Sequence, residues 1–226
     1  MLLPILLLIS TISLAEAGKF TPKKYELELT PGFNGDNSFT GNTKIHVYVT
    51  DSVEEFDLHV SKDLDVEKVI FWTAKTFDSK FNPVLKGNDA TFKKDGDKIH
   101  VTLSAPITQA DIAMKGFIEI AYKGKAGKKG ANKGLFLTND VDYETNLKNG
   151  NAIHLFPILE DVGAPLSLYI ITPPRAAVEI ERIDGENLIK AQRGVEGKEL
   201  ISNYFHTGSQ KVKTSSLQFK IKAPTV

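Results

Sequence analysis

Short runs of alternating apolar and polar residues recur along most of this sequence and constrain its fold more than any other feature. This alternation has the period of a strand with one buried and one solvated face. The runs are also rich in β-branched and aromatic residues, which favour strands. Helical periodicity is limited to residues 108–114, enough for one or two turns. The sequence therefore predicts an all-β protein. The clearest runs are residues 25–29, 43–50, 98–103, 117–122 and 217–221.

Turn residues separate these runs at short intervals. Asp-Gly pairs at 95–96 and 184–185 suit hairpin turns that require positive φ. The stretches 30–36 and 87–89 are predicted to be further turns. This spacing predicts several packed antiparallel sheets in a twisted sandwich or saddle. Because neither an internal repeat nor a linker is visible, we expect residues 18–226 to form a single domain.

The first seventeen residues resemble a secretory signal peptide. Residues 2–14 form an apolar run that is too short for a membrane span of about 20 residues. The run ends in Ala15-Glu16-Ala17, the small-x-small pattern before a cleavage site. An uncleaved anchor or a buried first strand is the alternative. We expect cleavage after Ala17, a secreted protein and no membrane span in the mature chain.

Charge and cysteine content exclude several classes of function. The chain has 28 basic and 28 acidic residues, and removing Glu16 leaves 28 against 27. Such a balance indicates neither nucleic-acid binding nor binding to a membrane surface. The sequence has no cysteine, so cysteine catalysis and thiolate metal sites are excluded. The hydrophobic core must then stabilise the fold without disulfides, which a chain of this length can do.

Few residues suggest a catalytic site. The acidic pair Glu160-Asp161 is expected to cap backbone amides, with paired catalytic carboxylates as the alternative. No Gly-x-Ser-x-Gly motif supports a serine nucleophile. We expect the histidines to be structural, although a zinc site built from three distant histidines is the alternative. No two of the five histidines lie within five residues of each other: His46, His59, His100, His154 and His206.

Two segments are candidates for binding. Residues 123–134 contain five lysines and no large apolar side chain, which predicts an exposed, mobile loop. A solvated loop and a site for an anionic glycan or membrane are its alternative roles. In the stretch 71–81, most aromatic residues are expected in the core, and any exposed one is the first candidate for a binding anchor. The candidate anionic-ligand residues are Lys123, Lys125, Lys128, Lys129 and Lys133, and the aromatic residues are Phe71, Trp72, Phe77 and Phe81.

Several short motifs follow one another in a distinctive order along the chain. They are Tyr25-x-Leu27-x-Leu29-x-Pro31, Phe39-x-Gly41-x-x-x-Ile45, Phe56-x-Leu58-His59, Leu64-x-Val66-x-x-Val69, Ile118-x-Ile120-x-Tyr122-x-Gly124 and Gly134-Leu135-Phe136. Their order resembles the non-catalytic amino-terminal domain of the M1 zinc aminopeptidase family, as a stand-alone secreted domain. Residues 158–170 also resemble the family's Cys-Phe-Asp-Glu-Pro region, and residues 205–219 resemble the strand that precedes its catalytic domain.

Residues 145–157 align without gaps on the family motif Thr-Gln-Phe-Glu-Pro-x-x-Ala-Arg-x-x-Phe-Pro. The resemblance implies that the Gln and Glu of this motif hold the substrate's free amino terminus. Here these positions are Asn146 and Lys148, and the family Arg is Ile153. A cation would repel an ammonium group that a carboxylate attracts. The remnant of the substrate subsite, Asn146 and Lys148, is thus predicted to have lost its recognition, with Lys148 exposed.

The family's zinc-binding His-Glu-x-x-His and its Gly-x-Met-Glu-Asn motif are both missing. We therefore expect no zinc, no cofactor and no catalysis. The expected function is a secreted binding protein on this scaffold, with an unidentified protein or glycan partner. An accessory chain that docks onto a separate M1 catalytic domain is the main alternative, and a hydrolase with an unrecognised site is a further one.

Overall fold

The computed structural model describes residues 20–33, 37–113, 115–182, 189–195 and 199–224, and these form an all-β fold. The predicted signal segment and the turn predicted at 184–185 lie outside the described residues. The described strands are β1 (Phe20–Pro31), β2 (Ser38–Val49), β3 (Val53–His59), β4 (Asp65–Ala74), β5 (Lys86–Asp95), β6 (Lys98–Ile107), β7 (Lys115–Lys125), β8 (Gly134–Leu137), β9 (Tyr143–Asn146), β10 (Leu166–Thr172), β11 (Ala177–Arg182), β12 (Ile189–Gly194), β13 (Ile201–His206) and β14 (Gln218–Lys222). The described helices are three short 3₁₀ segments, η1 (Gln109–Ile112), η2 (Asn151–His154) and η3 (Thr214–Ser216).

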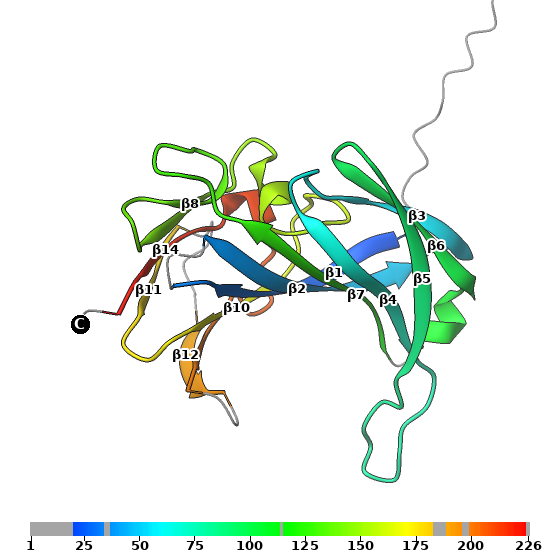
Figure 1. Ribbon diagram of the computed structural model, residues 1–226. Helices are drawn as coiled ribbons and strands as arrows, with labels where there is room; N and C mark the ends of the chain where they lie inside the picture. Colours follow the sequence, from blue (N-terminus) through cyan, green and yellow to red (C-terminus); the bar gives the residue numbers. More distant parts are fainter. Residues whose placement is uncertain (1–19, 34–36, 114, 183–188, 196–198, 225–226) are drawn as a thin grey trace, which may run out of the picture.

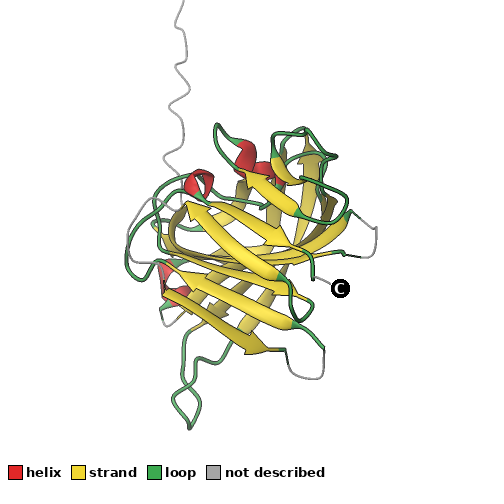
Figure 2. Cartoon of the chain, turned by 90° about the vertical axis from the view of Figure 1, so that its left-hand side faces the viewer, coloured by secondary structure: helices red, strands yellow, loops and turns green. Residues whose placement is uncertain are grey.

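The strands form one large and one small sheet, in a curved, saddle-like arrangement (Figures 1 and 2). The large sheet has the order β12-β13-β10-β1-β2-β7-β4-β5-β6-β3, and the small sheet has the order β11-β14-β9-β8. The predicted all-β class is confirmed. The large sheet is mixed rather than purely antiparallel, because β10 pairs with β1 in parallel. This pairing joins the first and last thirds of the chain in one sheet.

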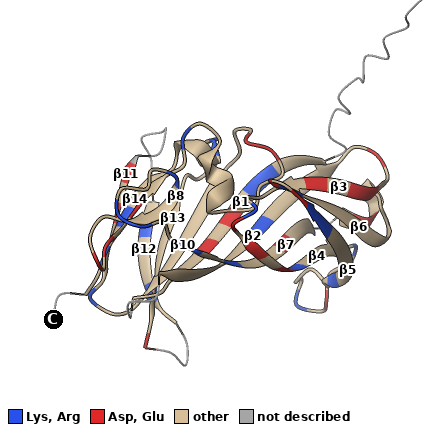
Figure 3. Cartoon of the chain, turned by 45° about the horizontal axis from the view of Figure 1, so that its top comes forward, with Lys and Arg blue, Asp and Glu red and all other residues tan. Residues whose placement is uncertain are grey.

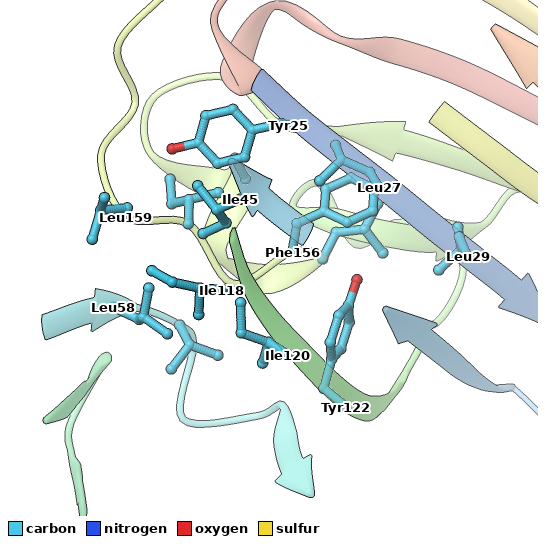
Figure 4. Packing of buried hydrophobic residues seen from close by; sticks show 14 of the residues in the cluster. Tyr25, Leu27, Leu29, Ile45, Leu58, Ile118, Ile120, Tyr122, Phe156 and Leu159 are labelled. Carbon is cyan, nitrogen blue, oxygen red and sulfur yellow. The ribbon is translucent and has the colours of Figure 1, made fainter. Parts of the chain in front are cut away.

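Alternation along the strands builds the core. Tyr25, Leu27 and Leu29 of β1 are fully buried, as are Ile45 of β2 and Ile118 of β7. Figure 4 shows these side chains gathered with residues of β3 and of the segment after η2. Fully burying one such side chain contributes about 1.5–3 kcal/mol. The chain therefore has the large core that a fold without disulfides requires.

Polar residues of the same strands point away from this core, because successive side chains in a strand face opposite sides. On β1 and β2, the outward positions pair Glu26 with Lys44 and Glu28 with Asn42. On the other side of β1, Glu28 is paired with Tyr169 of β10. We call this surface the outer face of the large sheet.

Glycine permits a close approach within the core at Gly41. A Cβ atom built there would lie 2.3 Å from the Tyr122 ring, a distance that no side chain tolerates. Tyr122 is fully buried beside Gly41, its partner across β2 and β7. Close packing against the Tyr122 ring therefore explains the glycine of the Phe39-x-Gly41 motif.

Two of the local predictions are confirmed and one is wrong. Gly96 has a φ of 58° in the turn between β5 and β6, as the Asp-Gly signal predicted. The expected helical turn is η1, and Lys75 and Thr108 lower the pKa of Asp111 within it to about 2. Residues 87–89 are not a turn, because they pair with β4 as part of β5. None of the described helices has the length and apolar character that crossing a bilayer requires.

Candidate binding site

The predicted subsite remnant lies where β9 leaves the small sheet. Thr145 is fully buried, and its hydroxyl accepts a hydrogen bond from the Phe219 amide at 2.9 Å. Asn146 accepts a bond from the Lys148 amide at 3.3 Å through its side-chain oxygen. The Lys148 side chain is exposed, which confirms the prediction of its exposure. Burying an unpaired ammonium group would cost too much free energy, which explains why the Lys148 side chain lies in solvent.

Asp161 of the acidic pair caps backbone, as predicted. Its Oδ1 accepts hydrogen bonds from the Thr214 hydroxyl at 2.8 Å and from the Ser215 amide at 3.3 Å. The Glu160 side chain is exposed, and its backbone carbonyl accepts a hydrogen bond from the Tyr25 hydroxyl at 2.6 Å. The pair thus ties β1 and η3 to the connection that leads to β10.

The lysine-rich segment is only partly a loop. Lys123 and Lys125 belong to β7, and Lys123 pairs with Glu67 at 2.8 Å and with Asp65 at 3.3 Å. These carboxylates raise the pKa of Lys123. The expectation that no apolar group anchors the segment is wrong, because Ala126 is buried and donates a hydrogen bond to the Asn37 carbonyl. The exposed lysines that make no ion pair with described residues are Lys125, Lys128, Lys129 and Lys133.

The aromatic stretch after β4 differs from its prediction. Phe71 lies in the core, and Trp72 is half-buried on the outer face. Phe77 and Phe81 are 50% and 85% exposed, so the expectation that most of these aromatic residues fill the core is wrong. They lie on the connection between β4 and β5 rather than in a strand, which explains why no sheet covers them.

An open cavity of about 400 Å³ lies on the outer face, and we call it the outer-face cavity. Its position follows from the pairing of β2, β1 and β10, which brings polar positions of three strands together. Figure 3 shows acidic and basic positions side by side on β1 and β2. The volume falls within the range typical of small-molecule sites. The lining residues are Glu26, Glu28, Asn42, Lys44 and Tyr169.

Hydrogen bonds and ion pairs hold the floor of this cavity. Glu119 of β7 accepts hydrogen bonds from the Trp72 indole at 2.6 Å and from the Asn42 amide at 3.2 Å. Lys44 Nζ lies 3.5 Å from the same carboxylate. The Tyr169 ring stacks on Tyr204 of β13, with a centroid distance of 4.7 Å. These contacts therefore hold the side chains around the cavity in place without a ligand.

The surroundings of two cavity residues, Glu26 and Tyr169, shift their pKa values and fix their charges. Glu26 Oε1 lies 3.2 Å from His46 Nε2 and 2.7 Å from Lys24 Nζ. His46 and Lys24 lower the pKa of the Glu26 carboxyl to about 2, although burial opposes them. Burial, with a contribution from Glu26 and Tyr204, raises the pKa of Tyr169 to about 12. At neutral pH Glu26 is ionised and the Tyr169 hydroxyl keeps its proton.

This arrangement suits a ligand that both donates and accepts hydrogen bonds. Glu28 is exposed and forms no ion pair with any described residue, so its carboxylate is free to accept. The Tyr169 hydroxyl and Lys44 ammonium can donate, and the Tyr169 ring offers an apolar surface. Sequence reasoning missed this site. Its polar positions were visible in residues 25–29 and 43–50, but the β1–β10 register was not.

No family model matches the sequence, and no curated protein matches it. Solved structures match, among them the M1 zinc metallopeptidase from Deinococcus radiodurans, with a TM-score of 0.65 and 15% identity over 90% of this chain. A mutant of that enzyme bound to a Tyr-Ser-Ala substrate gives a TM-score of 0.66 at the same identity. A two-domain M1 zinc metallopeptidase mutant bound to L-tryptophan gives 0.63 at 16% identity, again over 90% of this chain.

This chain has the amino-terminal, all-β fold of the M1 zinc metallopeptidases. The resemblance predicted from the motifs is thus confirmed at the level of the fold. The chain spans 42–43% of the length of the three matched structures.

The described residues of this M1-type domain do not fit a zinc site. In the part of the chain that the structure describes, no group of three or more His, Cys, Asp or Glu side chains could hold a metal ion. Its histidines have other contacts. His100 lies 3.0 Å from Asp57 on the neighbouring strand, and His206 stacks on Tyr204.

Proposed function

We propose that this chain is a secreted, non-catalytic binding protein built on the M1 amino-terminal scaffold. The observation that carries the proposal is the outer-face cavity, a polar site with fixed charges on a rigid sheet. Sites on strands hold their side chains more precisely than sites on loops. The mixture of donors, acceptors and an aromatic ring favours a neutral sugar of a glycan as the ligand, because sugar hydroxyls satisfy donors and acceptors alike.

The non-catalytic part of the proposal is supported by Lys148. Under the predicted alignment, this exposed ammonium replaces the carboxylate that would hold a substrate's amino terminus. Opposite charge is what such recognition requires, so Lys148 opposes aminopeptidase activity at this position. The purified chain should not hydrolyse aminoacyl or peptide substrates, with or without added zinc. Metal analysis should find no stoichiometric zinc, and turnover that a chelator abolishes would refute this part of the proposal.

Binding at the cavity can be tested with a glycan array followed by calorimetric titration of the best ligand. Glu28→Gln should weaken binding about tenfold or more, because a lost hydrogen bond to a charged group costs about 1.5–3 kcal/mol. Tyr169→Phe should weaken it by about two- to tenfold, because a neutral hydrogen bond contributes about 0.5–1.5 kcal/mol. Glu54→Gln is the matched control, since Glu54 is an exposed carboxylate on β3, away from the cavity-lining residues. Equal loss in the control, or no loss in the cavity variants, would remove the cavity from the proposal.

The second candidate function is an accessory chain that docks onto a separate M1 catalytic domain. The likeness to 42% of the length of an M1 enzyme supports it, because the same fold occurs there within a longer chain. A retained docking face would expose a continuous apolar patch. Outside the connection between β4 and β5, the exposed large apolar side chains of the described residues lie on separate elements: Tyr48, Val141, Val162 and Ile189. This distribution favours the free-standing binder. Co-elution with an M1 catalytic domain in size-exclusion chromatography would favour the accessory role.

A further inference from the structure

The connection between β4 and β5 projects from the body of the molecule (Figures 1 and 2). We call residues 75–85 the β4–β5 hairpin. Four of the eight exposed large apolar side chains among the described residues lie within it. Single exposed apolar residues are ordinary, but a cluster marks an interaction site. The four are Phe77 (50% exposed), Phe81 (85%), Val84 (50%) and Leu85 (43%).

Hydrogen bonds around Asp78 hold the tip of the hairpin in one shape. Its Oδ1 accepts bonds from the amides of Lys80 and Asn82, both at 2.8 Å, and its Oδ2 accepts one from the Asn82 side chain at 3.3 Å. The Asp78 amide donates to the Asn82 carbonyl at 2.8 Å, and the Phe81 amide donates to the Asp78 carbonyl at 3.1 Å. Further down, Val84 and Thr76 are joined by a backbone bond of 2.9 Å. The apolar side chains are therefore presented by a braced turn.

Phe81 has a backbone conformation that points to a function. Its φ is 60°, in the left-handed region that bulky residues rarely adopt. Such strain persists only where surrounding bonds fix it, and it concentrates at functional sites. Here the Asp78 turn fixes it, and the result is a phenyl ring that remains 85% exposed.

Basic residues flank this apolar tip. Lys80 and Lys86 are exposed and make no ion pair with described residues. Asp78, the nearest carboxylate in sequence to Lys80, is already used inside the turn. Asp89, the nearest to Lys86, is exposed on β5 and forms no ion pair with it among the described residues. Lys75 at the base is held by Asp111 at 2.6 Å. An apolar tip between unpaired ammonium groups matches the two requirements for binding at an anionic lipid surface.

We propose that the β4–β5 hairpin inserts Phe77, Phe81, Val84 and Leu85 into the headgroup region of an anionic lipid bilayer. Lys80, in the Asp78 turn, then contacts the lipid phosphates, and Lys86, at the start of β5, lies farther from the bilayer but within reach of its negative surface potential. The tip is convex and a single hairpin wide, which is small for a stable protein interface, whereas a bilayer needs no matching surface. The proposal goes beyond the proposed glycan binding, because no residue of the hairpin lines the outer-face cavity.

Vesicle co-sedimentation of residues 18–226 tests this proposal. Phosphatidylcholine vesicles containing phosphatidylserine should sediment the protein, and vesicles of phosphatidylcholine alone should do so more weakly. The double variant Phe77→Ser/Phe81→Ser should bind roughly tenfold more weakly or worse, since exposed rings supply the apolar contact area. Lys80→Gln/Lys86→Gln should reduce the dependence on phosphatidylserine and on salt.

Ile189→Ser is the matched control, because Ile189 is 54% exposed on β12 and lies outside the hairpin. It should bind vesicles like the wild type, and all variants should keep the wild-type melting temperature. Absence of sedimentation with both vesicle types would overturn the proposal, as would unchanged binding of the Phe77→Ser/Phe81→Ser variant. A concentration-dependent dimer that is lost in this variant, without vesicle binding, would assign the hairpin to a second copy instead.

Discussion

Glu26 and Glu28 show how two carboxylates in one strand acquire different roles. Both face outward from β1, two residues apart. Glu26 contacts Lys24 and His46 and has a lowered pKa, whereas Glu28 is exposed and has no ion pair among the described residues. Glu26 is thus committed to the structure of the outer face. The carboxylate of Glu28 is free to bind a ligand. A change at Glu28 should therefore affect binding, and a change at Glu26 should affect stability.

The contribution of Glu26 to stability should depend on pH. Its pKa is lowered from 4.5 to about 2 by His46 and Lys24, so the folded state binds the proton less tightly than the unfolded state does. The stabilisation is then complete above pH 4.5 and is lost as the pH falls towards 2. Glu26→Gln should lower the free energy of unfolding at pH 6, and the difference from wild type should shrink by more than half near pH 3. Urea unfolding of both proteins between pH 6 and pH 3 measures this difference in the free energy of unfolding.

Glu54→Gln serves as the control for that series, because Glu54 is exposed and has no ion pair among described residues. It should leave stability nearly unchanged at every pH. A Glu26→Gln deficit that stays constant between pH 6 and pH 3 would show that the deficit does not come from the ionised carboxylate.

Sequence reasoning identified residues whose roles are local. Lys148 is exposed and Asp161 caps an amide, as their charge and neighbours predicted. It missed Glu26 and Tyr169, because their meeting in the outer-face cavity depends on which strands pair and in which register. Phe81 was identified only as one of several aromatic residues, since no local pattern distinguishes a core ring from one held outside by a turn.

At the scale of elements, the strands with clear alternation were predictable and their partners were not. The pairing of β1 with β10 is parallel and joins residues more than 130 positions apart. Local alternation says nothing about such a partner. The same limit explains why residues 87–89 were misassigned as a turn, because their Gly-Asn-Asp composition is weaker than the pairing that β4 provides.

The loop between β7 and β8 should be the first site of limited trypsin cleavage. The loop exposes three lysines to the protease: Lys128, Lys129 and Lys133. Ordering the backbone costs about 1–2 kcal/mol per residue, and few hydrogen bonds in this loop offset that cost. The two fragments should stay together after the cut, because β1 of one pairs with β10 of the other. Mass spectrometry of the time course and native size-exclusion chromatography measure both outcomes.

Replacing these three lysines with glutamine is the control, and it should slow the first cut and move it elsewhere. Fragments that separate without denaturant would mean that this loop is a linker between two domains. If the loop binds an anionic glycan, neutralising Lys125, Lys128 and Lys129 should weaken that binding and flatten its salt dependence.

At the scale of the whole molecule, the two sheets share one core. The continuous cluster of buried apolar residues includes Leu27 and Ile118 of the large sheet together with Leu135 and Phe219 of the small one. The large sheet also contains strands from both halves of the chain. Neither sheet can be lost without exposing apolar surface of the other, so the two should unfold together.

A chain of residues 18–226, without the predicted signal segment, should therefore melt in one cooperative transition. Differential scanning calorimetry should give equal calorimetric and van't Hoff enthalpies. Phe156→Ala should lower the melting temperature without splitting the transition, because Phe156 is fully buried among the core residues of Figure 4. The expected loss is about 3–5 kcal/mol, or roughly 6–20 °C for a chain of this size. Phe81→Ala is the matched control and should leave the melting temperature unchanged, since its ring is 85% exposed. Two resolved transitions in the wild type would instead divide the chain into two domains.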